Sequence, residues 1–512
     1  MALGALLYST LLFGQSEFDA LKYVQPDING TAKYTSMAGA FGALGGDASA
    51  IKDNPAGLGI YNKSEVTGTL NLLFQQTSAD WNGVNNKENL INLGANNISI
   101  VLAKKTKAGE SGTKGLLNSN FSISYNILKS FDRSLNVKNA VNGSESSMTD
   151  YIANFTGSIS PEDLSKTNSY DPYISANIPW ISVQAYDAGL IARNPFTGTW
   201  ASTLSGIPET VTPSFVLTEK GFVDEYSIGW AGNLSNFIYL GATANVQSIN
   251  YTSYSTYNEI FGDGGFMAMI DTISTKGNGV NLNIGTIIKP LKFLSLGFSA
   301  QTPTLFILKD NYNSKLNYET PVDTGIFATP GSRSNYQLKS PLQLTASAAF
   351  ILEKLAVVSF EYDYSNITGM LLMNKNGDQQ DYATQNLNMK SNLANMQTIK
   401  IGGEFNINDN YSVRAGYANS SNPTITGSTK ILPSNSTRTD SEYFLHKSTN
   451  YLTAGLGYQK NNWFADVAFK YSTYNETFSP YSPNGVTLAQ NEKPATLSTT
   501  NTNLVISLGY KF

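Results

Sequence analysis

The strongest constraint on the fold is an alternation of apolar and polar residues that recurs from residue 65 to the end of the chain. Residues 121–127 read FSISYNI and residues 342–348 read LQLTASA, so apolar side chains occupy every second position. Successive side chains of a β-strand point to opposite faces. Each such segment therefore predicts a strand with one polar and one apolar face.

About fourteen segments of this kind follow one another, and most are about ten residues long, the length that a tilted strand needs to cross a bilayer. They lie near 65–75, 95–105, 119–129, 224–233, 237–257, 278–289, 293–302, 341–351, 355–366, 397–406, 410–418, 449–460, 463–474 and 502–512.

The connections between these segments predict how the strands are joined. Five are very short, at residues 234–236, 290–292, 352–354, 407–409 and 461–462. Each is followed by a connection of roughly 20 to 40 residues, and the longest connection, 130–223, follows the third strand. Short and long ends that alternate over an even strand count are typical of outer-membrane barrels, with periplasmic turns and extracellular loops. We therefore predict an all-β fold, a transmembrane antiparallel β-barrel of about 14 strands over residues 65–512.

Composition excludes several other classes of protein. The mean hydropathy of −0.20 argues against a bundle of membrane helices, and a net charge of −4 gives no basic surface for nucleic acid. The chain has no cysteine and one histidine, so thiol catalysis and disulfides are excluded and histidine chemistry is possible at one place only. We expect no enzyme activity, no catalytic residues, no cofactor and no bound metal.

The first residues suggest an export signal. Residues 2–14 read ALGALLYSTLLFG, an apolar block followed by Gln15 and Ser16, although no lysine or arginine precedes it. We predict a signal peptide over residues 1–16 with cleavage near Gln15 or Ser16; the alternative is a buried strand or helix end.

Residues 17–64 lack the alternation, and residues 30–60 are rich in glycine and alanine. Glycine permits tight bends and close backbone approach, so this part is either a flexible leader or a plug within the barrel. Two motifs decide between them: Gly45, Gly46 and Asp47 begin GGDASA, and Asn54, Pro55, Ala56 and Gly57 begin NPAGL. They resemble the FadL family of outer-membrane transporters for long-chain fatty acids and aromatic hydrocarbons.

The resemblance implies that residues 17–64 form an N-terminal hatch that closes a fourteen-stranded barrel, with the two motifs as its gate. Residues 289–304 resemble a hairpin of Bacteroidetes members, which are often labelled hemin receptors or outer-membrane transport proteins. The longest loop follows the third strand here, unlike in the fatty acid transporter, so the ligand contacts of that protein are not transferred to this chain.

Charged residues within the later strands fall on the polar register, where they would face the lumen. A Lys or Arg on the lipid face would cost about 2–4 kcal/mol at the middle of the bilayer, so this sorting supports a barrel. The residues are Glu361, Asp363, Lys400, Glu404, Arg414, Asp466 and Lys470. Either they form a salt-bridge network that braces the hatch, or a cation such as Lys400 or Arg414 meets a ligand carboxylate.

The long loop contains two predicted helical segments. Ser160 precedes Pro161, Glu162 and Asp163, as at a capped helix start. Residues 178–192 are apolar enough to need a partner, which could be the rim of the barrel or a hydrophobic ligand. His446, near the end of another loop, is interpreted as an ordinary surface histidine.

Together these features predict passive transport of hydrophobic small molecules, such as long-chain fatty acids, across the outer membrane of a Gram-negative cell. The expected partners are outer-membrane lipid, a hydrophobic ligand and the barrel-assembly machinery, for which the terminal Phe512 is the signal; a monomer is expected. The alternatives are a scaffold or accessory subunit for surface protein export or adhesion, and heme capture.

Overall fold

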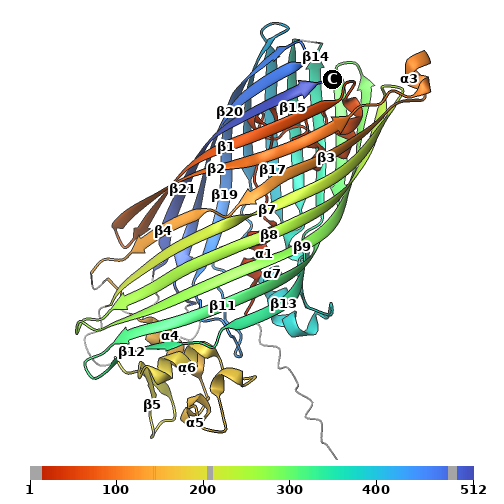
Figure 1. Ribbon diagram of the computed structural model, residues 1–512. Coiled ribbons are helices and arrows are strands. Elements are labelled where there is room, and N and C mark those ends of the chain that lie inside the picture. The colour runs from red at the N-terminus through yellow and green to blue at the C-terminus, as the bar shows by residue number, and fades with distance from the viewer. Residues whose placement is uncertain (1–13, 142, 145, 205–210, 354, 483–492) are drawn as a thin grey trace, which may run out of the picture.

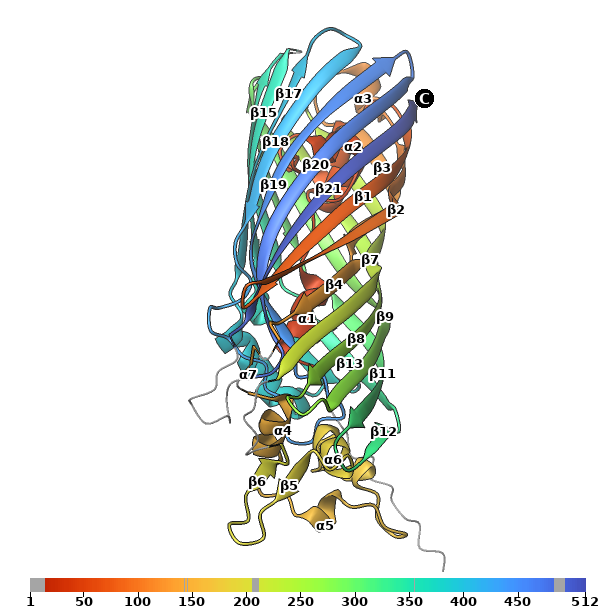
Figure 2. The same ribbon diagram turned by 90° about the vertical axis from the view of Figure 1, so that its left-hand side faces the viewer.

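The computed structural model describes residues 14–141, 143–144, 146–204, 211–353, 355–482 and 493–512. Most of them form one closed, antiparallel β-barrel (Figure 1, Figure 2). Residues 1–13 of the predicted signal peptide lie outside the described residues. No helix in the described ranges is long and apolar enough to cross a membrane.

The wall consists of fourteen strands, which confirms the predicted fold class. Each pairs with its neighbour along the chain, and the last strand pairs with the first and so closes the barrel. Four wall strands are interrupted and carry more than one label. In order, the wall strands are β1 (Glu65–Trp81), β2 (Val84–Leu102), β3 (Leu116–Ser130) with β4 (Arg133–Lys138), β7 (Thr212–Leu234), β8 (Ile238–Ile260), β9 (Phe266–Leu291), β10 (Leu294–Gln301) with β11 (Leu305–Glu319), β12 (Thr324–Ala328) with β13 (Ser332–Lys339) and β14 (Gln343–Leu352), β15 (Ala356–Ser365) with β16 (Leu371–Asn374), β17 (Met396–Asn406), β18 (Tyr411–Ser420), β19 (Tyr443–Lys460), β20 (Trp463–Ser479) and β21 (Ala495–Lys511).

The period of two places apolar side chains outside and polar side chains inside. On β3, Ile123 is 66% exposed while its neighbour Ser122 is 3% exposed; on β9, Leu282 is 56% exposed and Asn283 only 1%. The wall therefore presents an apolar outer surface and a polar lumen, as the alternation predicted.

Many strands are longer than the predicted ten residues, and β9 has 26. Beyond the apolar band the strands continue with polar residues on both faces, so hydrophobic alternation does not show their ends. Because the ends of the first two strands were predicted too close to the apolar band, residues 76–94 were predicted as a long loop that does not exist. β1 and β2 are joined by a tight turn at Asn82 and Gly83, both with positive φ (51° and 85°), the Asn-Gly chemistry of a two-residue hairpin.

The two ends of the barrel differ. One end, here called the turn end, holds the five short connections and the C-terminal residue, together with α3 (Lys107–Ser111) between β2 and β3 (Figure 1). The opposite end, here called the cap end, holds the long connections. The longest spans residues 139–211, shorter than the predicted 130–223 because β3, β4 and β7 extend into it.

The residues of this connection form a cap on the barrel (Figure 2). Its elements are α4 (Met148–Thr156), α5 (Pro161–Leu164), η3 (Pro172–Ile174), α6 (Trp180–Asp187), β5 (Ile191–Arg193) and β6 (Trp200–Ser202). Ser160 caps α5 as predicted, because its side chain accepts a hydrogen bond from the Asp163 amide. Of the two alternatives for residues 178–192, packing on the barrel holds: Gln184 of α6 donates to the carbonyl of Phe327 in β12 at 3.2 Å.

A hydrophobic cluster closes the cap end. Ile152 and Ile181 of the cap pack in one buried group with Trp81 of β1, Phe478 of β20 and Leu316 of β11. Since β11 lies six strands from β1 in the wall, the cluster joins opposite sides of the barrel at this end.

The N-terminal segment lies inside the barrel (Figure 2). It contains α1 (Glu17–Val24), α2 (Ala32–Ser36), η1 (Ser49–Lys52) and η2 (Pro55–Ile60). The remaining helices are η4 (Ile367–Gly369), η5 (Gln380–Tyr382) and α7 (Ala383–Asn392), which lie between β15 and β17. We call residues 14–64 the hatch.

Candidate functional site: the hatch, the lumen cavities and the wall seam

Glycines at two motif positions let the hatch fold back on itself. Gly45 and Gly46 adopt the left-handed conformation, with φ of 60° and 67°, which favours glycine. A Cβ on Gly45 would lie only 2.5 Å from the Cα of Gly57, and the Gly46 amide donates to the Gly57 carbonyl at 3.2 Å. The two motifs therefore contact each other, and their glycines permit the contact.

Asn54, Pro55 and Ala56 attach the hatch to the wall. The Asn54 side chain accepts from the Ala56 amide at 3.1 Å and donates to the Thr286 carbonyl of β9 at 3.1 Å. The wall has no side chain at this point: a Cβ on Gly285 would lie 2.0 Å from Asn54 Oδ1, and one on Gly241 would lie 2.4 Å from the Pro55 carbonyl carbon. The motif thus lies in a recess formed by wall glycines of β8 and β9.

Asp47 acts within the hatch. Its carboxylate accepts hydrogen bonds from the Thr31 hydroxyl at 2.6 Å and from the Ser49 amide at 2.8 Å. Burial raises the pKa of Asp47. These contacts hold residues 31 and 49 together and reach no wall residue.

The predicted lumen charges face inward and pair with one another. Lys400 Nζ lies 2.7 Å from both Glu361 Oε1 and Asp363 Oδ2. Arg414 contacts Glu404 and Asp466, each at 2.5 Å. Register arguments placed all of these residues on the inner face but did not predict which of them pair. Glu361, Asp363 and Glu404 lie on strands next to those of their cations, whereas Asp466 on β20 lies two strands from Arg414 on β18.

Two of the charged groups also hold the hatch. Glu361 Oε2 accepts from the Gly42 amide at 2.6 Å. Lys470 Nζ donates to Asp27 Oδ2 and the Ile28 carbonyl at 3.0 Å and to Asn29 Oδ1 at 3.1 Å. Burial alone would raise the pKa of Asp27, but Lys470 holds it below its usual value. The contacts match the bracing alternative, and both cations offered to a ligand carboxylate, Lys400 and Arg414, are each bound by two wall carboxylates.

Three cavities lined by described residues lie along the lumen. The outer cavity, about 260 Å³, lies toward the cap end beside α1. The middle cavity, about 140 Å³, lies below it, and residues 25–27 of the hatch line both. The inner cavity, about 810 Å³, is lined at the turn end by hatch residues such as Lys33 and by Arg414 and Lys511 of the wall. The hatch thus separates the inner cavity from the other two.

The wall itself is incompletely paired beside the outer cavity. β1 and β2 pair over their full length, but β2 pairs with β3 only from Asn97 to Leu102. Within the described residues, the part of β2 before Asn97 has no ladder to β3 or β4, although Leu135 and Val137 of β4 pack in one buried cluster with Ala79 and Trp81 of β1. Side-chain hydrogen bonds also cross this region, from Asn92 to Asp132 and from Asn82 to Asn139. We call this unpaired region the wall seam.

Hatch and cavity both reach the seam. The Leu128 carbonyl of β3 accepts, at 3.4 Å each, from the Asp27 amide and the Asn29 side chain of the hatch. The next residues, 129–133, line the outer cavity. Strand pairing is therefore interrupted in the part of the wall that lies beside a lumen cavity.

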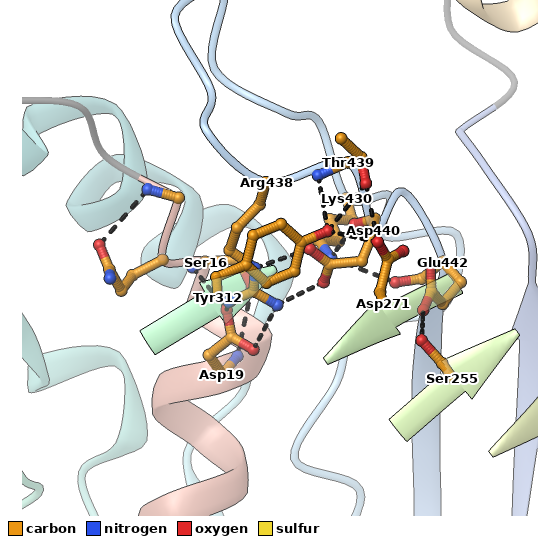
Figure 3. Close-up of polar contacts among 12 residues, drawn as sticks. Ser16, Asp19, Ser255, Asp271, Tyr312, Lys430, Arg438, Thr439, Asp440 and Glu442 are labelled. Carbon is orange, nitrogen blue, oxygen red and sulfur yellow. Dashed lines mark hydrogen bonds and ion pairs between the residues drawn. The ribbon is translucent and has the colours of Figure 1, made fainter. Parts of the chain in front are cut away.

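A cluster that the sequence did not predict surrounds α1 in the outer cavity (Figure 3). Residues 421–442, between β18 and β19, fold inward, and we call them the inward loop. Arg438 of this loop pairs with Asp19 of α1 at 2.8 Å and also with Asp440, and Lys430 pairs with Asp440 at 2.9 Å. Burial acts to raise the pKa of Asp19 and Asp440, but the neighbouring cations hold both below their usual values.

The inward loop is also attached to the wall. Tyr312 of β11 accepts from the Thr439 amide at 3.0 Å and donates to Asp271 of β9 at 2.7 Å. Glu442 accepts from Ser255 of β8 at 3.2 Å. A loop has no periodicity that could have placed these residues in the lumen, so no sequence signal was available.

The interpretation of His446 as a surface residue is wrong. It lies on β19, lines the outer cavity and is only 15% exposed at its side chain. Its Nε2 is 3.1 Å from Thr449 Oγ1 and its Nδ1 is 3.5 Å from Glu476 Oε1. The error arose because β19 begins six residues before the predicted start of its strand.

Phe512 follows β21 at the turn end and is 58% exposed. Its backbone exchanges hydrogen bonds with Ser64, at 2.9 and 3.1 Å. These bonds tie the chain end to the start of the barrel, and the role of Phe512 in assembly stays a prediction.

No protein-family model matches the chain, and no curated sequence matches it. Solved structures do match it. A FadL homologue from Pseudomonas aeruginosa is 11% identical, with a TM-score of 0.56, and the match covers 96% of this chain and 99% of that one. The toluene transporter TodX from P. putida is 13% identical, with a TM-score of 0.52, and the match covers 95% and 99%. At such low identity these matches establish the fold, which is that of FadL-type barrels.

Proposed function

We propose that this protein is a passive channel for hydrophobic small molecules in the outer membrane of a Gram-negative cell. Two similar structures are described as a FadL homologue and a toluene transporter. The apolar outer wall supports a membrane location, with the turn end toward the periplasm. A monomer assembled by the barrel machinery is expected.

One observation carries the proposal: the outer cavity lies beside the wall seam, with the cap on one side of it along the axis and the hatch on the other. The hydrophobic cluster around Trp81 and Phe478 lies at the cap end, and the hatch lies between the outer cavity and the inner cavity. We infer that a ligand in the outer cavity passes through the seam rather than along the axis. A hydrophobic molecule gains free energy by passing between apolar surfaces rather than through water.

The hatch supplies the gate. Its motif residues bind the wall through Asn54 in the Gly285 recess, and Lys470 holds residues 27–29 beside the seam. Movement of hatch residues 25–29 would join the outer and middle cavities, because residues 25–27 line both cavities and lie between them.

Deletion of residues 30–60 tests the gate. The variant should form a larger and steadier pore in planar bilayers than the full chain, since the deletion removes α2, η1 and η2. Unchanged single-channel conductance would contradict gating by the hatch. Uptake of radiolabelled toluene by a host lacking such channels tests transport itself, and uptake no faster than in the empty host would contradict it.

A scaffold role is the second candidate, and one feature favours it. Phe196, between β5 and β6 of the cap, is 96% exposed, and Ile174 is 73% exposed. Exposed apolar side chains on a cap suit a protein partner. Retention of a secreted protein by the full chain, and its loss with Phe196→Ser, would support this candidate; equal retention by both would contradict it.

A further inference from the structure

Most of the cations beside the outer and middle cavities are paired with carboxylates. In the middle cavity, Lys400 lies between Glu361 and Asp363. In the outer cavity, four cations form ion pairs: Lys22 with Glu219, Arg133 with Glu476, Lys430 with Asp440, and Arg438 with Asp19 and Asp440. An anionic ligand would have to displace one of these carboxylates.

Two lysines of these cavities have no carboxylate partner among the described residues, and both bind the hatch instead. Lys129 Nζ donates to the Lys22 carbonyl at 2.9 Å. Lys52 Nζ donates to the Asn29 carbonyl at 2.5 Å. Because an ammonium group has three donors, a ligand carboxylate at either lysine would share that group with a carbonyl of the hatch.

Carboxylates outnumber cations along this path. The outer cavity is lined by eight Asp or Glu residues and five Lys or Arg residues, and the middle cavity by four and three. Several of these acids are held only by neutral donors. Asp271 accepts from Tyr312 and Thr439, and Glu225 from Gln247 and Ser227. Burial, together with repulsion from Asp440 and Asp271, raises the pKa of Glu442 to about 7. The outer cavity therefore already opposes one more negative charge.

Buried neutral atoms without a partner point to the same preference. Asn503 Oδ1 in the outer cavity and Asn283 Oδ1 in the middle cavity have no hydrogen-bond partner, and these residues are 4% and 1% exposed. Both atoms are acceptors, which an O–H or N–H group of a ligand can satisfy and an ionised carboxylate cannot. Ser365 Oγ beside the middle cavity is also unpartnered, and as a hydroxyl it can accept as well as donate. One buried donor of the outer cavity, Arg133 Nε, also has no hydrogen-bond partner, but it belongs to a guanidinium group whose charge is already paired with Glu476.

We propose that the lumen selects against anions and accepts uncharged amphiphiles whose head group donates a hydrogen bond, such as alcohols or phenols. This inference rests on the proposed function. It predicts that ionised fatty acids are poor cargo, since their carboxylate would meet an excess of negative charge and acceptors that have no donor.

Binding competition on the purified full chain in a neutral detergent tests the inference at pH 8, where a carboxylate ligand is ionised. The uncharged fluorophore N-phenyl-1-naphthylamine is the probe, and 1-decanol and decanoate are competitors of equal chain length. Because single-sign fields in clefts change local ion concentrations by about 10- to 1,000-fold, decanol should displace the probe at a concentration at least about tenfold lower. Decanoate that competes equally well or better would overturn the inference while leaving the channel function intact.

Failure of the probe and both competitors to bind would overturn the proposed function, and the inference with it. The double variant Asp271→Asn with Glu442→Gln should narrow the difference between decanol and decanoate, and Glu162→Gln, exposed on α5, should leave it unchanged. Lys129→Gln should leave decanoate competition unaltered; its loss in this variant would show that Lys129 binds the carboxylate and would overturn the inference.

Discussion

Gly285→Ala should detach the hatch from the wall. The added Cβ would lie 2.0 Å from Asn54 Oδ1, 2.9 Å from Asn54 Cγ and 3.0 Å from Pro55 Cδ. Neither partner can move easily, because Asn54 is buried and bonded on both sides and Pro55 is rigid. The strain should therefore fall on the contact between hatch and wall rather than on a flexible side chain.

The magnitude follows from the steric clash and from the hydrogen bond that it breaks. Overpacking costs about 1–3 kcal/mol, and the Asn54 bond to the wall, which it donates to the Thr286 carbonyl, contributes about 0.5–1.5 kcal/mol. Docking of the hatch should weaken by roughly 1.5–4.5 kcal/mol, which raises the undocked fraction by about 10-fold to about 1,000-fold or more.

Hydrogen exchange of amides 42–60 and single-channel conductance both report this change. Exchange should become faster and open events more frequent in Gly285→Ala. Gly68→Ala is the matched control, since a Cβ on this β1 glycine meets nothing within 4 Å. If both variants exchange and conduct alike, the recess does not hold the hatch and the reasoning fails.

Three further predictions concern other contacts. Lys470→Met should loosen residues 27–29 and cost about 1–3 kcal/mol, because it removes the Nζ hydrogen bonds to Asp27, Ile28 and Asn29; unchanged proteolysis of the hatch would contradict this. Since the pKa of Glu442 is raised from 4.5 to about 7, the folded state binds more protons over this range, and stability should fall as pH rises from about 4.5 to about 7. Glu442→Gln should flatten this dependence in thermal unfolding in detergent, and an unaltered slope would refute the assignment. Asn92→Cys with Asp132→Cys, joined by a bifunctional maleimide, should close the seam and slow toluene uptake, whereas uptake equal to that of the single-cysteine variants would exclude the seam as the route.

The sequence predicted the wall for a physical reason, whereas the hatch was predicted from the resemblance of its two motifs to the FadL family. A lipid-facing wall imposes a period of two, as Ile123 shows on β3 and Leu282 on β9. The strand ends were not predictable in this way, because the parts of the strands outside the bilayer need no apolar side chains. For the same reason the Asn82–Gly83 turn was not recognised, since it lies within residues that were predicted to form a long loop.

The residues of the outer cavity show more clearly which contacts cannot be predicted from the sequence. Register arguments placed Lys400 and Arg414 on the inner face, since charge on the lipid face is costly. No such argument applies to Arg438, whose partner Asp19 is 419 residues away in the chain. The pairing of loop residues with distant parts of the chain depends on how the inward loop folds, and the fold of a loop leaves no periodic pattern in the sequence.

The central claim is that the hatch must move relative to the wall for cargo to pass, and a reversible cross-link tests it most directly. A Cβ on Gly42 of the hatch would lie 3.2 Å from Cβ of Ser347 on β14, near the separation of a disulfide, about 3.5–4.5 Å. The chain has no cysteine of its own, so Gly42→Cys with Ser347→Cys can form one defined bond. Oxidation of this variant should stop toluene uptake and reduction should restore it, with each single variant unaffected by either treatment. Equal uptake in the oxidised and reduced states would contradict a moving hatch.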